Sequence, residues 1–187
     1  MKNIFYVLII ALFLGGCTYK NEALNLDSYK SEYAGPSSKD KKAIYLRWVK
    51  DVRSDKQHIG SVLQRGDTLA TLFTNVDFAD KYKEGIEYAL NLAGFDMSST
   101  AQSALIMEVY IKDIDIVYND KNFDTNLKGE IEIEVIIRKG DEVVTQNFKQ
   151  KGAKYVLSSN ESKDLEPFLY TLFADSINDI VSRLTRF

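Results

Sequence analysis

The stretch LKGEIEIEVIIRKGDE, residues 127–142, decides the fold of this chain. Its apolar and charged residues alternate, which places apolar side chains on one face of a β-strand and charged side chains on the other. Gly140-Asp141 follows as a glycine-first pair, which is typical of a two-residue type II′ turn. The stretch therefore predicts a strand that runs directly into a β-hairpin.

This short turn also predicts the register of the hairpin, with Lys139 opposite Glu142. Counting back from the turn gives four further pairs: Ile137 with Val144, Ile133 with Phe148, Glu132 with Lys149, and Glu130 with Lys151. Apolar pairs then share one face, and opposite charges face each other on the second face. The turn, the core pairs and the charge pairs thus agree on a single register.

Period-two alternation predicts further strands upstream of the hairpin. Residues 44–49 alternate, and so do residues 105–111. The alternation then slips by one residue near Lys112-Asp113, which a β-bulge would accommodate. Residues 54–74 show no sustained period, so either a short strand or a covering loop would fit them.

Two segments show the spacing of amphipathic helices. Residues 78–93 carry apolar side chains three and four positions apart, after Asn75 or Asp77 as a candidate N-cap and before Gly94 as a C-terminal stop. A second stripe begins after residues 158–162 and continues to the C-terminus, and Pro167 is tolerated in its first turn.

The element order β-α-β-β-β-α predicts the fold class. Strands that are mostly grouped, with helices to one side, favour an α+β two-layer sandwich with a mainly antiparallel sheet and two helices packed on one face. We expect a single domain over residues 43–187, since the sequence shows no repeat of fixed period and no second core.

Residues 1–16 are typical of a secretory signal, with a basic start at Lys2 and an apolar run that is too short to span a bilayer. The motif Leu14-Gly15-Gly16-Cys17 resembles the lipobox of bacterial lipoproteins. That resemblance implies cleavage before Cys17 and a covalent lipid on its sulfur, with acyl chains such as palmitate. An ordinary signal peptide with a chance cysteine, or a buried N-terminal helix, is the alternative.

Residues 17–42 are mostly polar and hold the breaker cluster Gly35-Pro36-Ser37-Ser38. They predict a lipidated cysteine followed by a flexible tether. In the alternative, Tyr19, Tyr29 and Tyr33 dock on the domain.

Charge and cysteine content exclude several classes of function. The chain has a net charge of −3, and loss of Lys2 with residues 1–16 makes it −4. An acidic surface does not favour nucleic acid as a partner, so membrane attachment is expected through the lipid. Cys17 is the single cysteine. Once it carries a lipid, neither a disulfide nor thiol catalysis is available.

The loop from Asp51 to Thr74 is the candidate region for partner binding. Asp51, Arg53, His58 and Arg65 gather in a stretch without regular pattern, where binding residues often lie. The structural alternative is that Arg53 bridges loop carboxylates. His58 is the only histidine, so we expect no metal site, no catalytic centre and no cofactor other than the covalent lipid.

The layout resembles the YajG-like family of small bacterial lipoproteins. The matching features are the motif at 14–17, the strand running into Asp51-x-Arg53, the helix ending Leu92-Ala93-Gly94-Phe95, the strand 105–111, the Gly129 strand and the apolar C-terminal helix. The resemblance implies an envelope lipoprotein without an established reaction.

We therefore expect a non-enzymatic interaction or accessory module that binds another envelope protein. The alternative is a carrier that holds a lipid or other hydrophobic ligand between the C-terminal helix and the sheet. Thr18, in place of an aspartate after the cysteine, favours the outer membrane, with the domain facing the periplasm.

Overall fold

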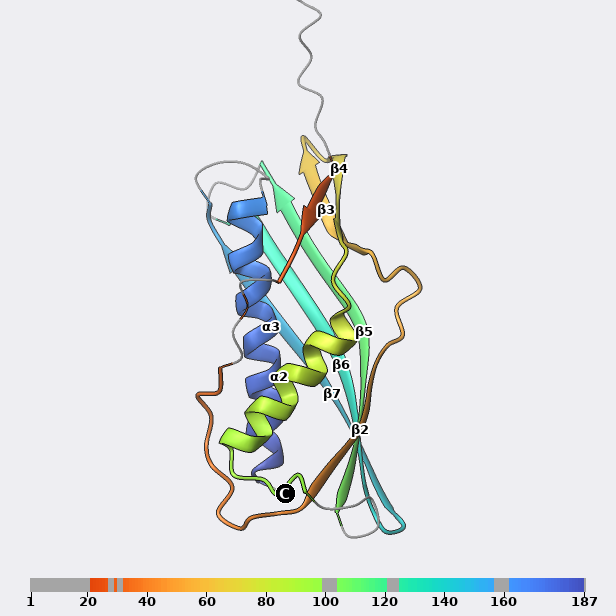
Figure 1. Ribbon diagram of the computed structural model, residues 1–187. Coiled ribbons are helices and arrows are strands. Elements are labelled where there is room, and N and C mark those ends of the chain that lie inside the picture. The colour runs from red at the N-terminus through yellow and green to blue at the C-terminus, as the bar shows by residue number, and fades with distance from the viewer. Residues whose placement is uncertain are drawn as a thin grey trace, which may run out of the picture.

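The computed structural model describes residues 21–26, 29, 32–98, 104–120, 125–156 and 162–186. They form a mixed, open seven-stranded sheet with helices packed on one face (Figure 1), which confirms the α+β sandwich. The strands are β1 Glu22–Leu24, β2 Ile44–Asp51, β3 His58–Gln64, β4 Asp67–Thr74, β5 Leu105–Asn119, β6 Leu127–Lys139 and β7 Glu142–Lys154. The helices are α2 Phe78–Leu92 and α3 Ser162–Leu184.

The long strand β5 organises the sheet. One edge of β5 pairs with β6, and its other edge is shared by β2 along the first half and by β3 along the second. The sheet then continues from β3 to β4 and from β4 to β1. The β1–β4, β2–β5 and β3–β5 pairs are parallel, so the sheet is mixed. The β3–β4, β5–β6 and β6–β7 pairs are antiparallel, and the last two are the longest pairs of the sheet.

The β6–β7 hairpin has the register that the sequence predicts. Lys139 lies opposite Glu142, and the four further predicted pairs are all present. A type II′ turn requires a positive φ at its first central residue only. Gly140, in that position, has a φ of 59°, and the φ of Asp141 is not positive, so the predicted turn type is met. The predicted bulge in β5 is also confirmed, because the pairing with β6 shifts between Ile111 and Asp113.

Most of residues 54–74 form a second hairpin, β3–β4. Its two turn residues, Arg65 and Gly66, have φ values of 56° and 98°. Positive φ at both positions is the mark of a type I′ turn, whose twist matches that of the flanking strands. The pairing shifts twice along this hairpin, which removes the regular alternation that would have revealed two strands.

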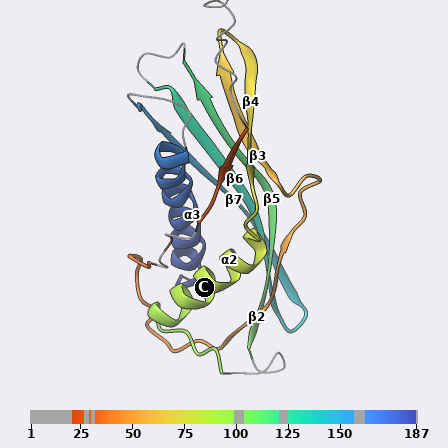
Figure 2. The same ribbon diagram turned by 45° about the horizontal axis from the view of Figure 1, so that its top comes forward.

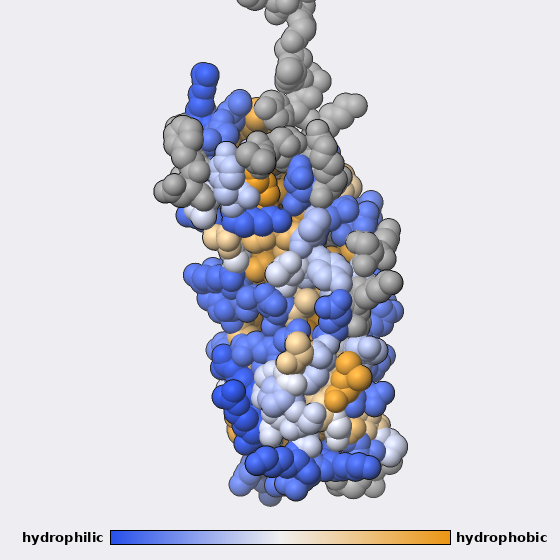
Figure 3. Space-filling view, turned by 90° about the vertical axis from the view of Figure 1, so that its left-hand side faces the viewer, coloured by the Kyte–Doolittle hydropathy of each residue, from blue (hydrophilic) through white to orange (hydrophobic). Residues whose placement is uncertain are grey.

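Both helices pack on the same face of the sheet (Figures 1 and 2). Asp77 caps α2, since its carboxylate accepts hydrogen bonds from the amides of Ala79 and Asp80. The buried Tyr82 hydroxyl of α2 lies 2.8 Å from the Ser176 hydroxyl of α3. Neither helix in the described part of the chain has the length and apolar character needed to cross a membrane. Seen from the side, the surface is mostly hydrophilic, with small separate apolar patches (Figure 3).

The segment before β2 differs from the flexible tether expected for residues 17–42. Within it, β1 pairs with β4, and the side chains of Leu24 and Leu26 are buried. The ring of Tyr29 meets that of Phe173 edge-on at 4.7 Å, and Tyr33 packs against the core. For Tyr29 and Tyr33, the alternative that the tyrosines dock on the domain therefore fits better than a flexible tether. Tyr19 and Cys17 lie outside the described residues.

Candidate functional site

An open hollow of about 510 Å³ lies where β2 and β4 end and α2 begins. The loop 52–57 forms one of its walls. Its lining is mixed, with apolar side chains beside amides, carboxylates and ammonium groups. The lining residues are Val49, Lys50, Asp51, Val52, Lys56, Gln57, Thr74, Asn75, Val76, Asp77, Phe78 and Ala79.

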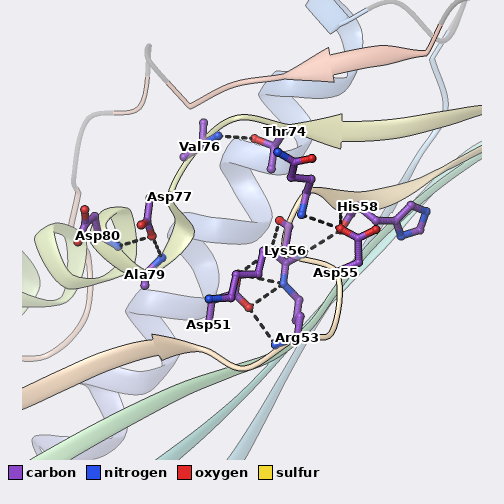
Figure 4. Close-up of polar contacts among 11 residues, drawn as sticks. Asp51, Arg53, Asp55, Lys56, His58, Thr74, Val76, Asp77, Ala79 and Asp80 are labelled. Carbon is purple, nitrogen blue, oxygen red and sulfur yellow. Dashed lines mark hydrogen bonds and ion pairs between the residues drawn. The ribbon is translucent and has the colours of Figure 1, made fainter.

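Arg53 holds the loop 52–57 closed from inside (Figure 4). Its Nε donates to Asp51 Oδ1 at 3.0 Å and its Nη2 to Asp51 Oδ2 at 2.7 Å. The same guanidinium donates to the backbone oxygens of His58 at 3.0 Å and Lys56 at 2.8 Å. One buried side chain therefore joins the end of β2, the loop and the start of β3; we call this set of contacts the Arg53 clasp.

A second set of bonds orders the far side of the loop. The Asp55 carboxylate accepts hydrogen bonds from the amides of Gln57 and His58, at 3.0 and 3.1 Å. These two bonds lower the pKa of Asp55 from its ordinary value, and the bond from the His58 amide has the larger effect. The His58 ring itself points away from Arg53 (Figure 4).

The opposite wall is equally fixed. Thr74 Oγ1 donates to the backbone oxygen of Leu24 at 2.8 Å and accepts from the amide of Val76 at 3.0 Å. Asp77 is held by the first turn of α2, as described above. The carboxylates of Asp51 and Asp77 are thus already engaged, whereas the side chains of Lys50 and Lys56 are exposed at the rim.

The structure brings together the side chains of two of the four residues proposed for partner binding, Asp51 and Arg53, and the backbone oxygen of a third, His58. Asp51 and Arg53 pair with each other, and their side chains are 6% and 5% exposed. This burial favours the structural alternative for both, because neither charge faces solvent. Arg65 lies in the turn at the other end of β3 from His58, roughly 20 Å away at about 3.3 Å per strand residue.

Several hollow-lining residues were not singled out by sequence reasoning, although some of them lie in the predicted stretch 51–74. Val52, Gln57 and Val76 belong to no motif, and only the tertiary structure places them beside one another. The one available signal was Asp51-x-Arg53 at a strand end, since an aspartate two residues before an arginine can accept both its amide and its guanidinium.

The acidic side chains of the fold do not form a metal site in the part of the chain that the structure describes. Within the described ranges, no group of three or more His, Cys, Asp or Glu side chains is placed to hold a metal ion. Asp113 and Asp115 are exposed on the uncovered face of the sheet. Partial loss of solvent around the Asp115 carboxyl, and after it the negative charge of Asp113, raise the pKa of Asp115.

The space between α3 and the sheet bears on the carrier alternative. A Cβ placed on Gly129 would lie 2.5 Å from a methyl carbon of Leu172 and 2.8 Å from the Phe168 ring. At Gly152 the corresponding distances to Leu172 and Phe168 are 2.9 and 3.1 Å. Here α3 packs directly onto glycine backbone, so a hydrophobic ligand would have to displace side chains that already fill the space.

Comparison with known proteins gives the chain a family. A sequence model of Lipoprotein_16, described as uncharacterized lipoprotein, matches residues 40–183. No curated protein matches the chain. Protein XCC0632 from Xanthomonas campestris, of family DUF330, is similar in structure, with 11% identity, a TM-score of 0.52, and 84% of this chain and 91% of that chain covered. A crystal structure of an uncharacterized protein gives 6% identity, a TM-score of 0.54 and coverage of 88% and 99%.

At such low identities the two structures show a shared fold and nothing more. The family model is the stronger finding, because it spans the chain from just before β2 almost to the end of α3. Membership implies association with the cell envelope. The protein therefore belongs to the Lipoprotein_16 family of uncharacterized lipoproteins, the YajG-like family that the sequence resembles.

Proposed function

We propose that this protein is a non-enzymatic interaction module, anchored to the membrane by a lipid on Cys17, and that its partner docks in the hollow beside the Arg53 clasp. The partner is another envelope protein. The anchor lies in the outer membrane, with the folded domain in the periplasm. The observation that carries the proposal is the order of the loop 52–57. Four hydrogen bonds from the buried Arg53 side chain join this loop to Asp51 in β2, to His58 in β3 and to Lys56 within the loop.

A fixed loop beside an open hollow suits binding. Ordering a mobile loop on association costs free energy, and a loop that is already ordered avoids that cost. The clasp leaves Val52 exposed, with 47% of its surface accessible, and Gln57 exposed beside it. An apolar side chain with polar neighbours at the edge of a hollow resembles the mixed composition of protein interfaces.

The charges of the hollow select the partner's chemistry. Arg53 neutralises Asp51, and backbone amides engage Asp77, while Lys50 and Lys56 remain exposed on the rim. An acidic polypeptide segment would complement these two lysines. Charge complementarity of this kind chiefly raises the association rate and the specificity.

Site-specific photocrosslinking in intact envelopes tests this proposal. A photoreactive amino acid at Val52 should yield one discrete crosslinked partner, whereas the same group at Thr145, exposed on β7, should not. Lys50→Glu with Lys56→Glu should remove that product. The charge-matched pair Lys83→Glu with Lys139→Glu, at exposed sites away from the hollow, should leave it unchanged. Equal products from Val52 and Thr145 would contradict docking at the hollow.

The non-enzymatic part of the proposal needs its own test. It is supported by the engagement of Asp51, Asp55 and Asp77 in structural hydrogen bonds, which leaves them poorly suited to proton transfer. A soluble form, residues 18–187, should show no turnover of envelope lipids, peptides or glycans. Turnover of any of these substrates would overturn it.

A further inference from the structure

We propose that the end of the molecule carrying the β3–β4 turn, the start of α3 and the close of β7 faces the lipid surface, at contact distance. We call it the turn end. The inference rests on the lipid at Cys17 in the proposed function. It adds to that function an orientation, which fixes the height of the hollow above the membrane.

The first step is the length of chain between the anchor and the fold. Cys17 is followed by β1, which begins at Glu22. Five residue steps separate the two positions, and a fully extended chain spans at most about 3.6 Å per residue. The Cα atom of Cys17 must therefore lie within roughly 18 Å of the Cα atom of Glu22.

The second step is that β1 is tightly held. Asn21 Oδ1 accepts a hydrogen bond from the amide of Thr71 at 3.2 Å, and Thr74 Oγ1 donates to the backbone oxygen of Leu24. Leu24 and Leu26 are 1% exposed in the core. Detaching this segment would expose both leucines, at a cost of about 1.5 to 3 kcal/mol each. The chain is therefore fixed to the domain at residues 21–26.

The third step is the position of β1 in the molecule. Glu22 pairs with Leu72 in β4, five residues, or about 17 Å, from Asp67 beside the β3–β4 turn. The opposite end, at Gly140, lies beyond the full length of β6, whose 13 residues span about 44 Å. Figures 1 and 2 show the start of β1 nearer the β3–β4 turn than the β6–β7 turn. The anchor therefore reaches the turn end and not the Gly140 end.

The fourth step is the chemistry of the turn end. Tyr155 lies just after β7 and is 49% exposed, and an aromatic ring with a polar tip suits a membrane–water boundary. Lys128 is exposed at the start of β6, and Arg65 in the β3–β4 turn. Asp67 and Asp120 balance these cations, so we attribute the contact to the lipid anchor and not to net charge.

The orientation places the hollow at a defined height. Asp51, on its wall, pairs with Ile111 in β5, eight residues from Asn119 at the turn end. Eight residues of strand span about 26 Å. The hollow is then held roughly that far from the lipid surface, open to a partner in the periplasm.

Depth-dependent fluorescence quenching on lipidated protein tests the orientation. Because Cys17 is the only cysteine and its sulfur carries the lipid, an introduced cysteine offers a unique thiol. Lys128→Cys labels the turn end, and Asp141→Cys labels the opposite end. In phosphatidylethanolamine–phosphatidylglycerol vesicles with a headgroup quencher, we expect at least a twofold greater loss of fluorescence for the label at 128. Equal or reversed quenching would overturn the orientation.

Two controls separate the orientation from the anchor itself. Intact mass and cosedimentation with vesicles first establish that each labelled protein carries its lipid. A ten-residue Gly/Ser insertion after Lys20, which adds roughly 17 Å of root-mean-square reach, should preserve cosedimentation and reduce quenching at 128. Lipidated, vesicle-bound protein without quenching at 128 would overturn the orientation and leave the proposed function standing. An unmodified mature N-terminus would overturn both.

Discussion

Arg53 and Asp51 form a two-point ion pair, with Nη2–Oδ2 at 2.7 Å and Nε–Oδ1 at 3.0 Å, inside the wall of the hollow. The guanidinium carbon also lies 5.4 Å from the centre of the Phe78 ring. Charge-assisted bonds of this fork geometry are among the stronger hydrogen bonds in proteins. The pair therefore shapes the hollow that we assign to partner binding, although neither of its charges faces the partner.

Removing this arginine should destabilise the fold. Arg53→Met leaves the carboxylate of Asp51 buried without its partner, which typically costs about 3 to 5 kcal/mol in the free energy of unfolding. Urea unfolding of residues 18–187 measures the loss. The control is Lys81→Met, which breaks an exposed pair with Glu84 and should cost less than about 1 kcal/mol. A loss below 1 kcal/mol for Arg53→Met would mean that the clasp does not support the fold.

Substitutions on the two faces of β6 should change stability to very different extents. Ile133 is buried, so Ile133→Asp places a charge in the core and should cost more than about 4 kcal/mol or prevent folding. Glu132 is exposed and pairs with Lys149, so Glu132→Gln should change stability by well under about 1 kcal/mol. Thermal unfolding compares the two. A larger loss for Glu132→Gln would mean that the buried face has been misassigned.

The glycine beneath α3 should be sensitive to a single methyl group. Gly129→Ala forces its new Cβ against Leu172 and Phe168, and overpacking of this kind typically costs about 1 to 3 kcal/mol. Leu172→Ala alone should cost about 2 to 5 kcal/mol through the cavity that it leaves. A double-mutant cycle measured by urea unfolding should show the two changes partly compensating each other. Simple additivity would mean that α3 can shift away without cost.

The charge ladder on the uncovered face should make stability depend on acidic pH. Hydrogen bonds from Lys149, then Lys151, lower the pKa of Glu130 from 4.5 to about 2. Its stabilising effect should be full above pH 4.5 and should fade as the pH falls toward 2, because the unfolded chain takes up the proton first.

Glu130→Gln isolates this contribution. Urea unfolding measures how much the free energy of unfolding falls between pH 6 and pH 3. This fall should be smaller in Glu130→Gln than in the unaltered protein. The two falls should differ by less than about 1 kcal/mol, because the ion pair is largely exposed. The difference should shrink in 0.5 M salt, where the Debye length is only about 4 to 5 Å. An equal pH dependence in both proteins would show that the ladder does not contribute to stability.

The membrane anchor depends on one atom. Cys17→Ser removes the thiol that would carry the lipid, so the variant should stay as an unprocessed precursor without acyl chains. Mass spectrometry of the membrane fraction measures both outcomes. Thr18→Ser, next to the same motif, serves as the matched control and should retain the lipid. A mature N-terminus at another residue, without modification, would contradict the lipoprotein assignment for Cys17.

Features with local causes were predictable from the sequence. The β6–β7 register follows from a two-residue turn and a period of two, which are both properties of adjacent residues. The bulge after Ile111 follows from a slip in one strand. The N-cap of α2 at Asp77, and Gly94 with its positive φ just after the C-cap Ala93, follow from side-chain and backbone chemistry within one turn of the helix.

The β3–β4 hairpin was missed although its turn is local. A type I′ turn usually carries Asn-Gly or Asp-Gly, and here Arg65 takes the first position with a φ of 56°. Gly60, inside β3, looks like a chain breaker in the sequence. In the fold, a Cβ at this position would lie 1.9 Å from the backbone oxygen of Ile116, so the glycine permits close approach of β5.

The sequence by itself determined the hairpin, the helices, the sandwich class and the motif at Cys17, because turn geometry, residue period and capping act over a few residues. Only the tertiary structure decided the parallel pairs β1–β4, β2–β5 and β3–β5, since parallel pairing joins segments distant in the chain that carry no local mark of their partners. For the same reason it alone decided that Arg53 is buried, that Val52 and Val76 meet at one hollow, and that residues 21–26 are held to the domain.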